Sequence, residues 1–591
     1  MKISDYIIKF LCDMWSDTIF SFSWWMITHL EDSAYLNKKV KLISVRHEQW
    51  WAFAAEWFSR SSNKIWIAMW TSWPWATNMI TWIGSAYFDS VPVIYITWQV
   101  NTYELTKNQQ VRQTWFQETD IVSMVSNITK FSYQIKDISE VKYVLEKAFF
   151  ICNHGRKWPV LIDIPMNIQR SEIDENSLIS YYNSKEYQKI INEDKKREQI
   201  LDNDVDILLK ELNNSKKPII LVWWWCRLGG GKKILWKIVK KLNIPVVSSL
   251  QWLDAFNHNE RNYIWMIWVH GNRYANITLM NADLVLVLWS RLDIRQTWAL
   301  KDKFCSNAKI IHVDIDSNEL WYNVKHTYKR IHQDLHKFLE MLATKELKNN
   351  QLRNKWLDEI NKVKSLLISI ETKKKDNWYY NMNYLFERFS EYLPKESVIV
   401  NDIWENQMWS SQSLNLWKDQ QLLNCWWMWA MWFSLPTAMG AYFANPKKKI
   451  ISVSWDWWFQ LNMQELETIS LHKIPLLMMV LNNKSLWMVK EFQNAYMWGR
   501  NIWTVIWYSC PNLKKIATAF WLKYFKIWKN SNLEKIFTNV LSQKLPTILE
   551  IEVSKASKVV PKMMFWNSLD NQAPELSENI KNKISDILHS N

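Results

Sequence analysis

Short apolar runs alternate with amphipathic or polar helical stretches along most of the chain, and they fall into three blocks. The first block carries the runs VKLISV, KIWIAMW, VPVIYITWQV and PVLIDIP; the second carries KPIILVWWW, ADLVLVL and AKIIHVDID; the third carries ESVIVNDIW, KKIISVSWDWW and PLLMMVLNN. Apolar runs of about four to eight residues separated by helical segments are typical of parallel strands buried on both faces. We therefore predict an α/β fold of three doubly wound parallel-sheet domains.

Two polar stretches separate these blocks. SKEYQKIINEDKKREQ spans residues 184 to 199, and a lysine-rich segment lies near residues 345 to 376. The predicted domains are residues 1–168, 190–345 and 376–565, followed by a C-terminal tail at 566–591. At 591 residues the chain is long enough for several domains of ordinary size.

Composition excludes several classes of protein. No run of about 18 apolar residues is present and the N-terminus is broken by charges, so we expect neither a membrane span nor a signal peptide, and a cytoplasmic protein. The six cysteines form no CxxC pair, which argues against a zinc or redox centre. The net charge of +15 comes from scattered lysines without a basic stripe, so no nucleic-acid partner is predicted.

Tryptophan and glycine occur in unusual numbers. The chain has 43 Trp and 8 Gly, whereas Gly makes up about 7% of a typical globular protein. Tryptophans stand where turns are expected, as in WTSWPWATN (70–78), VWWWCRLGGG (222–231) and CWWMWAMWF (425–433). Only glycine adopts positive φ or a close backbone approach at low cost. One hypothesis is that most of these positions are glycine in the living protein, encoded by UGA codons; the alternative is a truly Trp-rich chain.

The stretch ISVSWDWWFQ (451–460) carries one acid, Asp456, after a predicted strand. With glycine at 455, 457 and 458 it becomes Gly-Asp-Gly-Gly, and the next strand ends at Asn483, 27 residues after Asp456. This pattern resembles the metal and diphosphate fingerprint of thiamine-diphosphate enzymes. Mg²⁺ prefers oxygen ligands, so Asp456, Asn483 and the carbonyl of Ser485 are the predicted ligands. Without the rest of the pattern, Asp456 would be interpreted as a helix N-cap.

In the first block, SVRHEQWWAFAAEWFSR (44–60), WTSWPWATN and ITWQV resemble, with glycine for tryptophan, the pyrimidine-binding domain of acetohydroxyacid (acetolactate) synthases. The resemblance covers nearly the whole chain. It implies that Glu48 hydrogen-bonds N1′ of the cofactor's aminopyrimidine, where an apolar pocket would raise the pKa of its carboxyl. It also implies that Pro74 and Gln99 contact the cofactor, and that Phe116 and Gln117 line the reaction centre.

In the third block, NDIWENQMW (401–409) and CWWMWAMWF resemble the family's cofactor-binding segments. The family more often has Gln-His where this chain has Glu405 and Asn406, and Trp409 is a candidate for a genuine tryptophan. Met431 would wedge the cofactor into its bent shape, and the carbonyl of residue 429 would accept from its 4′-amino group. The implied cofactor contacts are Glu405, Asn406, Gln407, Met408, Trp429, Met431, Trp457, Trp458 and Met488.

The middle block holds a glycine loop that is not a P-loop, because Lys232 is followed by lysine and not by Ser or Thr. In acetohydroxyacid synthases this domain holds FAD in a structural role, and WSRLDIRQTW, MIWVHGNRYAN and HVDIDSNEL match the flanking segments. The implied FAD contacts are Trp223, Trp224, His270, Gly271, Arg291 and Asp314. Arg295 matches the family's arginine for the acceptor carboxylate.

The resemblance implies an acetolactate synthase that decarboxylates pyruvate on thiamine diphosphate with Mg²⁺ and transfers the acetyl unit to a second 2-keto acid. Two alternatives stay open: a sibling carboligase with another acceptor, such as a keto-sugar nucleotide, and a catalytically dead nucleotide-binding protein if the tryptophans are real. The family implies a homodimer or tetramer, with a possible small regulatory subunit. Phe492 stands where biosynthetic members carry Trp, and Met166 stands where they carry Lys.

Overall fold

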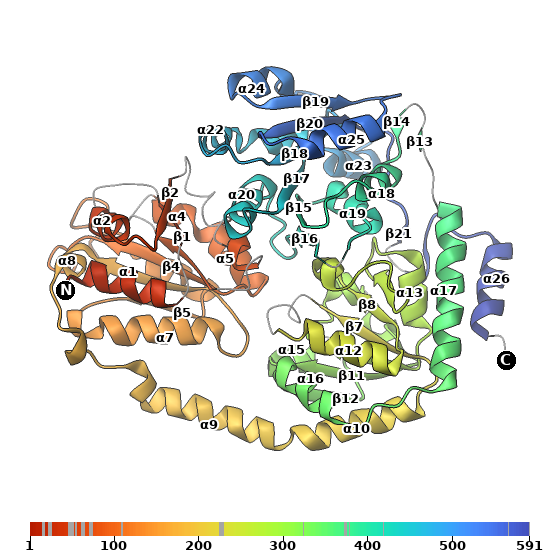
Figure 1. The fold of residues 1–591 in the computed structure, drawn as a ribbon, viewed down its shortest axis with the longest axis horizontal. Coiled ribbons are helices and arrows are strands. Elements are labelled where there is room, and N and C mark those ends of the chain that lie inside the picture. Colours follow the sequence, from red (N-terminus) through yellow and green to blue (C-terminus); the bar gives the residue numbers. More distant parts are fainter. Residues whose placement is uncertain are drawn as a thin grey trace.

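The computed structural model describes residues 1–14, 18–21, 27–44, 53, 56–60, 65–69, 75–107, 110–223, 230–298, 300–322, 324–371, 375–376, 379–417, 419–564 and 567–589. Three six-stranded sheets dominate this part of the chain, and every strand pair within them is parallel. Figure 1 shows the three domains in sequence colours, with the N-terminal sheet on the left, the central sheet below and the C-terminal sheet above.

The N-terminal sheet has the strand order β2-β1-β3-β4-β6-β5. Its longest strand, β4, is buried over its full length, as its apolar run predicts. The strands are β1 (Thr18–Ser21), β2 (Lys41–Ser44), β3 (Trp66–Met69), β4 (Val93–Gln99), β5 (Phe131–Gln134) and β6 (Val160–Pro165). The helices are α1 (Ile3–Asp13), α2 (Thr28–Leu36), α4 (Trp75–Asn78), α5 (Ile80–Phe88), α6 (Ile121–Val125), α7 (Val141–Asn153) and α8 (Met166–Arg170).

The central sheet has the order β12-β11-β10-β7-β8-β9, and the polar helices α9 and α10 lead to it from the N-terminal domain (Figure 1). The strands are β7 (Pro218–Val222), β8 (Val246–Ser248), β9 (Tyr263–Met266), β10 (Leu284–Leu288), β11 (Lys309–Asp314) and β12 (Lys329–His332). The helices are α9 (Lys185–Gln199), α10 (Leu201–Asn214), α12 (Lys232–Leu242), α13 (Arg273–Met280), α14 (Ile294–Thr297), α15 (Ser317–Tyr322), α16 (Leu335–Thr344) and α17 (Gln351–Glu371), with a 3₁₀ segment, η5 (Leu250–Ala255).

The C-terminal sheet has the order β16-β15-β17-β18-β20-β19. The strands are β15 (Ser397–Asn401), β16 (Gln421–Asn424), β17 (Lys449–Trp455), β18 (Leu477–Asn482), β19 (Lys523–Ile527) and β20 (Thr547–Glu552). The helices are α18 (Met382–Ser390), α19 (Glu405–Ser413), α20 (Ser434–Ala444), α21 (Asp456–Gln460), α22 (Leu466–Leu471), α23 (Trp487–Tyr496), α24 (Leu513–Ala519) and α25 (Leu533–Ser542).

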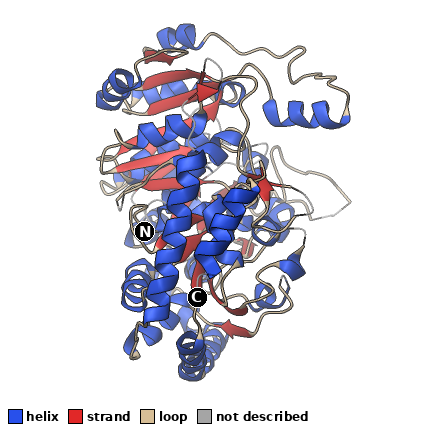
Figure 2. Cartoon of the chain, turned by 90° about the vertical axis from the view of Figure 1, so that its right-hand side faces the viewer, coloured by secondary structure: helices blue, strands red, loops and turns tan. Residues whose placement is uncertain are grey.

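The end of the chain returns to the central domain. The antiparallel pair β21 (Lys562–Met563) and β22 (Gln572–Ala573) lies beside the loop after β9, where the Met563 amide donates to the carbonyl of Val269 (2.8 Å). The last helix, α26 (Glu578–His589), packs against α17, and Figure 2 views the molecule from this side. A second small pair joins β13 (Lys375–Asp376) to β14 (Tyr379–Tyr380).

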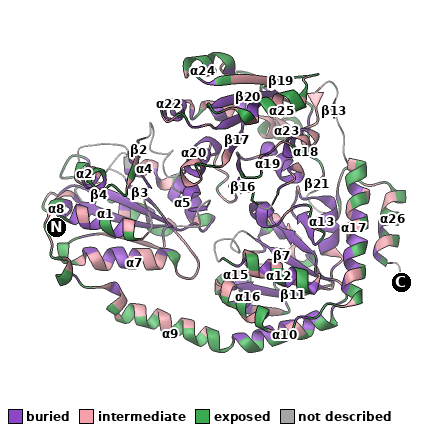
Figure 3. Ribbon diagram, viewed as in Figure 1, coloured by how far each residue is buried: buried purple, intermediate pink, exposed green. Residues whose placement is uncertain are grey.

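The three parallel sheets confirm the predicted fold class. Their strands are largely buried and the outer faces of the helices are exposed (Figure 3), as expected for sheets covered on both faces. The predicted domain limits at 168, 190, 345, 376 and 565 stay predictions. In the described ranges, none of the helices combines the length and apolar character that crossing a membrane requires.

Candidate functional site

The C-terminal sheet places predicted site residues around one topological switch point. From β15 the chain continues to β16 on one side of the sheet and then to β17 on the other. Ligands of open α/β sheets bind outside the carboxyl ends of the strands at such a point. Asp402 follows β15, Asp456 follows β17, and Asn483 follows β18. The predicted metal ligands therefore come to the edge where a ligand is expected.

Asp456 is the first residue of α21 and is fully buried. Its Oδ2 accepts from the Lys484 amide (3.1 Å), which ties the end of β17 to the turn after β18. Its Oδ1 is buried and makes no hydrogen bond of ordinary geometry in the described chain, although the Tyr508 hydroxyl interacts with the carboxyl. Burial raises the pKa of this carboxyl to about 6. Trp455, not Asp456, occupies the N-cap position. Asp456 thus leaves one oxygen available to a ligand. An N-cap aspartate would instead use its side chain to accept a hydrogen bond from a backbone amide of its own helix.

The turn after β18 supplies the other two predicted ligands. Asn483 Oδ1 accepts from the Ser485 amide (3.0 Å), and Lys484 between them has φ of 52°. The Ser485 hydroxyl is buried without a partner among the described residues. The described chain contains no cluster of three or more His, Cys, Asp or Glu side chains that could hold a metal. A site here must therefore combine one carboxylate with neutral oxygens, which suits Mg²⁺ when phosphate supplies further ligands.

Four predicted cofactor contacts begin helix α19. Glu405 is buried, neither of its carboxylate oxygens has a partner in the described chain, and burial raises its pKa to about 8. The side-chain NH₂ group of Asn406 donates to the carbonyl of Val453 (3.2 Å), and that of Gln407 donates to the carbonyl of Cys425 (2.9 Å). Met408 lies in the core. Asn406 and Gln407 thus tie the start of α19 to β17 and to the end of β16, whereas the Glu405 carboxylate has no such contact.

Asp402 is a polar residue of this site that the sequence analysis did not single out. It is fully buried, it accepts from the Ile403 amide (2.9 Å) and the Ser434 hydroxyl (3.0 Å), and burial raises its pKa to about 7. These bonds join the end of β15 to the start of α20. The available signal was an acid directly after an apolar strand, the same signal that identified Asp456.

The turn after β16 carries the predicted wedge and carbonyl. Trp429 and Trp432 are in the left-handed region, with φ of 46° and 60°, and Met431 and Trp429 are half-buried. The Trp432 carbonyl accepts from the Asn462 amide group (2.6 Å). Met488, on α23, is half-buried. The structure describes each of these predicted cofactor residues, but the wedge and carbonyl roles stay predictions.

Arg295 brings the central domain to this turn. It lies on α14, donates through Nη1 to the Trp426 carbonyl, and its guanidinium lies 4.4 Å from the centroid of the Trp429 ring. Arg291 is paired with Glu319 (2.7 Å) and lies 4.6 Å from the Trp427 ring. The predicted acceptor arginine and the predicted cofactor turn are therefore neighbours.

The predicted residues of the N-terminal domain are described only in part. Glu48 and Pro74 lie outside the described residues. Gln99 ends β4, and its amide donates to the carbonyl of Thr119 (2.6 Å). Phe116 is 68% exposed, whereas Gln117 is buried with φ of 66°. These contacts stay within the N-terminal domain.

The central sheet follows the order 3-2-1-4-5-6 counted from β7, which is the order of dinucleotide-binding folds. Trp223 follows β7 and is buried; Trp224 lies outside the described residues. Gly271 needs to be glycine, because a Cβ there would lie 2.4 Å from the Trp268 amide nitrogen. Asp314 ends β11, where burial raises its pKa to about 7, and burial lowers the pKa of His270 to about 3.

Comparisons with known proteins agree with this arrangement. Residues 1–124, 205–342 and 402–551 match the N-terminal TPP binding domain, the central domain and the C-terminal TPP binding domain of thiamine pyrophosphate (diphosphate) enzymes. The acetolactate synthase large subunit of Lactococcus lactis is 30% identical over 94% of this chain and 93% of its own. That of Porphyra purpurea is 29% identical over 92% and 90%, and the chloroplastic acetolactate synthase of Arabidopsis thaliana is 29% identical over 95% and 82%.

The chain belongs to the acetolactate synthase large-subunit family. This membership confirms the predicted enzyme class, a thiamine-diphosphate-dependent carboligase of the acetolactate synthase type, and confirms thiamine diphosphate as the cofactor.

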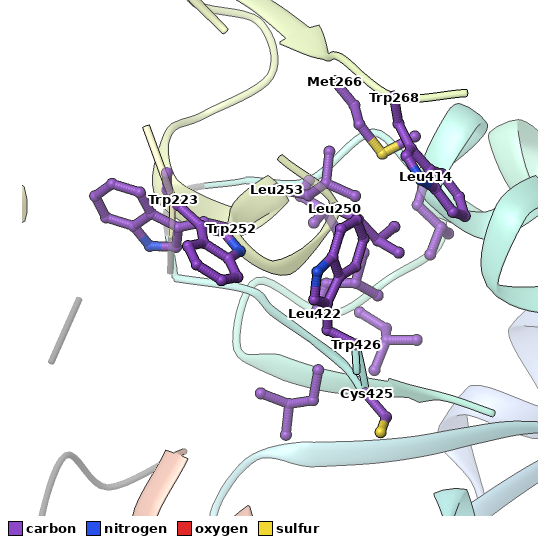
Figure 4. Close-up of a cluster of buried hydrophobic side chains, with 14 of the residues drawn as sticks. Trp223, Leu250, Trp252, Leu253, Met266, Trp268, Leu414, Leu422, Cys425 and Trp426 are labelled. Carbon is purple, nitrogen blue, oxygen red and sulfur yellow. The ribbon is translucent and has the colours of Figure 1, made fainter. Parts of the chain in front are cut away.

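Four buried indoles gather between the central and C-terminal domains. Figure 4 shows Trp223, Trp252, Trp268 and Trp426 in one buried cluster; Trp252 lies in η5, and the other three follow β7, β9 and β16. The rings of Trp268 and Trp426 lie 5.7 Å apart, and the indole N–H groups of Trp223, Trp252 and Trp268 have no hydrogen-bond partner among the described residues. Each such buried donor costs about 1–3 kcal/mol. As written, side chains occupy the space next to the strand ends.

The switch point of the C-terminal sheet shows the same conflict. The rings of Trp404 and Trp458 lie 5.0 Å apart between the ends of β15 and β17, and the Trp455 and Trp458 indoles lack hydrogen-bond partners in the described chain. Trp457 is half-buried with its ring 5.6 Å from that of Tyr508. The polar atoms here fit the metal and diphosphate of the cofactor, whereas the indoles stand where the phosphates would approach backbone amides.

The backbone also departs from what tryptophan prefers. Ten of the eighteen described non-glycine residues with positive φ are tryptophans. The sequence analysis expected such strain or close approach in the turns, and positive φ is found at 429 and 432 but not at 455, 457 or 458, which are extended or helical. The ten are Trp265, Trp289, Trp298, Trp404, Trp429, Trp432, Trp498, Trp503, Trp507 and Trp521.

Proposed function

We propose that this chain makes acetolactate: pyruvate is the donor, CO₂ leaves, and the acetyl unit passes to a second 2-keto acid. The observation that carries the proposal is the contact of Arg295 with the predicted cofactor turn of another domain, at the Trp426 carbonyl, which puts a cation for a carboxylate beside that turn. The C-terminal domain that carries this turn also supplies Asp456, which is tied to the turn after β18. Thiamine diphosphate, when bound, supplies the electron sink for decarboxylation. Arg295 binds the acceptor carboxylate through parallel hydrogen bonds.

We assign the remaining roles by the family resemblance. Glu48 holds a proton beside the aminopyrimidine, and Gln117 and Phe116 surround the reacting atoms. Mg²⁺ is held by Asp456, Asn483 and the Ser485 carbonyl. The Oδ1 of Asp456 supports this assignment, because a buried carboxylate oxygen without a hydrogen bond of ordinary geometry is otherwise costly.

We also propose that most of the tryptophans are glycine in the living protein. Three observations support this: their number, their left-handed backbones, and their buried indoles without hydrogen-bond partners. The rings of Phe53 and Trp82 lie only 3.6 Å apart, closer than the about 4.5–7 Å that aromatic pairs prefer. Trp409 is different, because it is helical and its indole donates to the Lys558 carbonyl (3.4 Å); it is the better candidate for a genuine tryptophan.

We propose FAD binding only for the chain with glycine at these positions. With tryptophan at these positions, the indoles of Figure 4 fill the space between these strand ends and leave no room there for a flavin. Glycine at 223, 252, 268 and 426 would remove four large buried side chains, of which Trp268 lies with its ring 5.1 Å from that of His270. A bound flavin would give the purified native protein an absorbance near 450 nm. Acid precipitation should separate this absorbance from the polypeptide.

A closed dimer is the proposed working unit, with Glu48 of one chain meeting Asp456 of its partner. Helix α23 has no buried residue, and apolar side chains on it and on the following loop are exposed: Phe492, Tyr496, Ile502 and Ile506. The exposed Phe116 supports the same proposal. Light scattering of the purified protein tests the dimer.

Product analysis with pyruvate alone, thiamine diphosphate and Mg²⁺ tests the function. Acetolactate, measured as acetoin after acid treatment, is the expected product. Consumption of pyruvate without acetolactate would favour the sibling carboligase with another acceptor. No pyruvate consumption, together with no rise in melting temperature on adding cofactor and metal, would favour a dead enzyme.

A further inference from the structure

A buried charge cluster joins the three domains beside the predicted cofactor turn. Glu56 and Arg60 lie on the helical segment 56–60, and Asp89 follows α5; none is more than 2% exposed. Arg60 donates through Nη2 to Asp89 Oδ2 (2.7 Å) and to Glu56. Charges this deeply buried need partners of opposite sign, because desolvation otherwise removes several kcal/mol of stability. The pairing explains how the cluster is tolerated, but not why it stands at a domain junction.

Asp89 also accepts hydrogen bonds from both other domains. Gln251, on η5 of the central domain, donates through Nε2 (3.0 Å). In the C-terminal domain the backbone amide of Trp426 donates to Oδ2 (3.1 Å) and that of Trp427 to Oδ1 (3.0 Å). One carboxylate of the N-terminal domain therefore holds two consecutive peptide groups at the start of the cofactor turn.

The other side of the same turn is held by Arg295. The Trp426 carbonyl accepts from Arg295 Nη1, while the Trp426 amide donates to Asp89. The residue is thus clamped between an anion and a cation that come from two different domains. Because both contacts use backbone atoms, they are independent of whether residues 426 and 427 are tryptophan or glycine.

We propose that Asp89 is a positioning residue: its carboxylate sets the place of the turn at 426–429 and, through it, of Arg295. The inference deepens the proposed function and rests on it for the role of Arg295. A carboxylate suits this task because donors converge on both of its oxygens, and it accepts without donating. Asparagine would present an NH₂ group to some of those donors and leave them unpaired.

Hydrogen exchange of the cofactor-free protein tests the positioning without any activity. In Asp89→Asn the amides of 426 and 427 should exchange at least about tenfold faster, measured by mass spectrometry on peptides covering 421–433. Glu146→Gln is the matched control. Glu146 is a buried carboxylate of the same domain that accepts from the Ser180 hydroxyl (2.6 Å) and the Tyr181 amide (2.8 Å), far from the turn in sequence. Unchanged exchange at 421–433 in Asp89→Asn would overturn the proposal.

Kinetics then test the consequence for the site. Asp89→Asn should lower kcat/KM by about 100-fold, the usual result of misplacing a reacting group by about 1 Å. Its effect should be less than additive with that of Arg295→Lys, because both act through the same peptide. Asp89→Glu keeps the charge and should give an intermediate loss; it serves if Asp89→Asn does not fold. Wild-type kcat/KM in Asp89→Glu, or full additivity with Arg295→Lys, would refute the role.

These outcomes separate this inference from the proposed function. If the wild-type enzyme converts pyruvate to another product, the proposed acceptor is wrong, yet faster exchange at 421–433 in Asp89→Asn would still support Asp89 as the residue that holds the turn. If acetolactate forms but exchange and kcat/KM are unchanged in Asp89→Asn, the function stands and the positioning role falls.

Discussion

The N-terminal and C-terminal sheets follow the same path and hold one similar contact. Counted along the chain, both have their strands in the order second, first, third, fourth, sixth, fifth. Both also join an amide on the fourth strand to a carboxylate on the sixth: Gln99 to Asp163 (3.3 Å) and Asn482 to Glu550 (2.8 Å). The path and this inner contact therefore do not distinguish the two domains.

The difference lies at the end of the third strand. After β17 the chain reads Asp-Trp-Trp, beginning with Asp456; after β3, residues 70–75 read WTSWPW, without a carboxylate. Asp456 thus has no counterpart after the third strand of the N-terminal sheet, which supports the C-terminal sheet as the proposed metal half. The acid assigned to the N-terminal sheet, Glu48, follows the second strand instead. One fold carries two halves of a site because a few strand-end residues differ.

The largest expected effect comes from the tryptophans that follow the third strand in both sheets. We expect peptides of the native protein covering 455–458 to have glycine masses at 455, 457 and 458. A chain made with literal tryptophans should neither bind thiamine diphosphate nor turn over pyruvate, whereas the glycine chain should do both. Left-handed tryptophans cost about 1–3 kcal/mol each, so several rival the about 5–15 kcal/mol that stabilise a whole protein.

Residue 409 provides the matched control, because its indole has a hydrogen-bond acceptor and the glycine chain keeps tryptophan there. Trp409→Gly should lower the melting temperature of the glycine chain. Tryptophan masses at 455–458 in the native protein would contradict the glycine proposal. The tryptophans at the switch point of the C-terminal sheet would then be genuine.

The second-largest effect is expected from removing Asp456, the acid that distinguishes the two sheets. Asp456→Ala should weaken Mg²⁺ and cofactor binding and leave little activity at ordinary metal concentration, with partial recovery in excess Mg²⁺. Calorimetric titration with Mg²⁺ and cofactor measures this. The control is Asp163→Asn, which changes a buried carboxylate of the other sheet and should leave metal affinity unchanged. Equal losses in both variants would mean that Asp456 acts only through stability.

Glu48→Gln tests the acid of the N-terminal half. Turnover should fall by about 10²–10⁴-fold, the usual contribution of a proton-transferring side chain, while the cofactor still raises the melting temperature. Steady-state kinetics and thermal shift on one preparation give both results. A variant that turns over pyruvate normally would leave the N-terminal half without its proposed acid.

The fold could be predicted from sequence because each parallel strand is a short apolar run between helical segments, and β4, β10 and β18 all show it. The position of Asp456 and Asn483 at one edge of the sheet could be predicted because both directly follow strands, whereas their role as metal ligands stays a prediction. Pattern alone did not suggest the buried cluster of Glu56, Arg60 and Asp89, because its partners are far apart in sequence. The i, i+4 spacing of Glu56 and Arg60 suits an ordinary helix pair as well as a buried one.

The contacts of Asn406 and Gln407 inside the protein show another limit. Their cofactor contacts stay predictions, and sequence did not show that their side-chain NH₂ groups donate to the carbonyls of Val453 and Cys425. Which polar side chain is satisfied inside the protein depends on strand order, and strand order is a tertiary property. The unpartnered Glu405 beside them could be distinguished only in the folded chain.

A smaller effect is expected at Asp163, whose contact with Gln99 has a counterpart in the C-terminal sheet. Its partners Thr97, Gln99 and Gln134 are neutral, and burial raises its pKa to about 6. A raised pKa means that the folded state holds the proton more tightly, so this stabilisation is present below about pH 4 and is lost as pH rises through 6. Asp163→Asn should remove about 2 kcal/mol of that pH dependence. The difference in melting temperature between variant and wild type, followed from pH 4.5 to 7.5, measures it; a constant difference would contradict the assignment.

The smallest effect concerns the choice of acceptor, where each half departs from the family at one position: Met166 on α8 and Phe492 on α23. Phe492 is half exposed, and its ring lies 4.7 Å from that of Tyr496. Phe492→Trp should favour 2-ketobutyrate over pyruvate by about tenfold, since one apolar contact changes discrimination by about 1–3 kcal/mol. Competition between the two keto acids, with both products measured, gives the ratio. Tyr496→Trp adds the same indole one helical turn away and should leave the ratio unchanged. If both variants shift it equally, the preference depends on bulk near the entrance, and Phe492 has no particular role in acceptor choice.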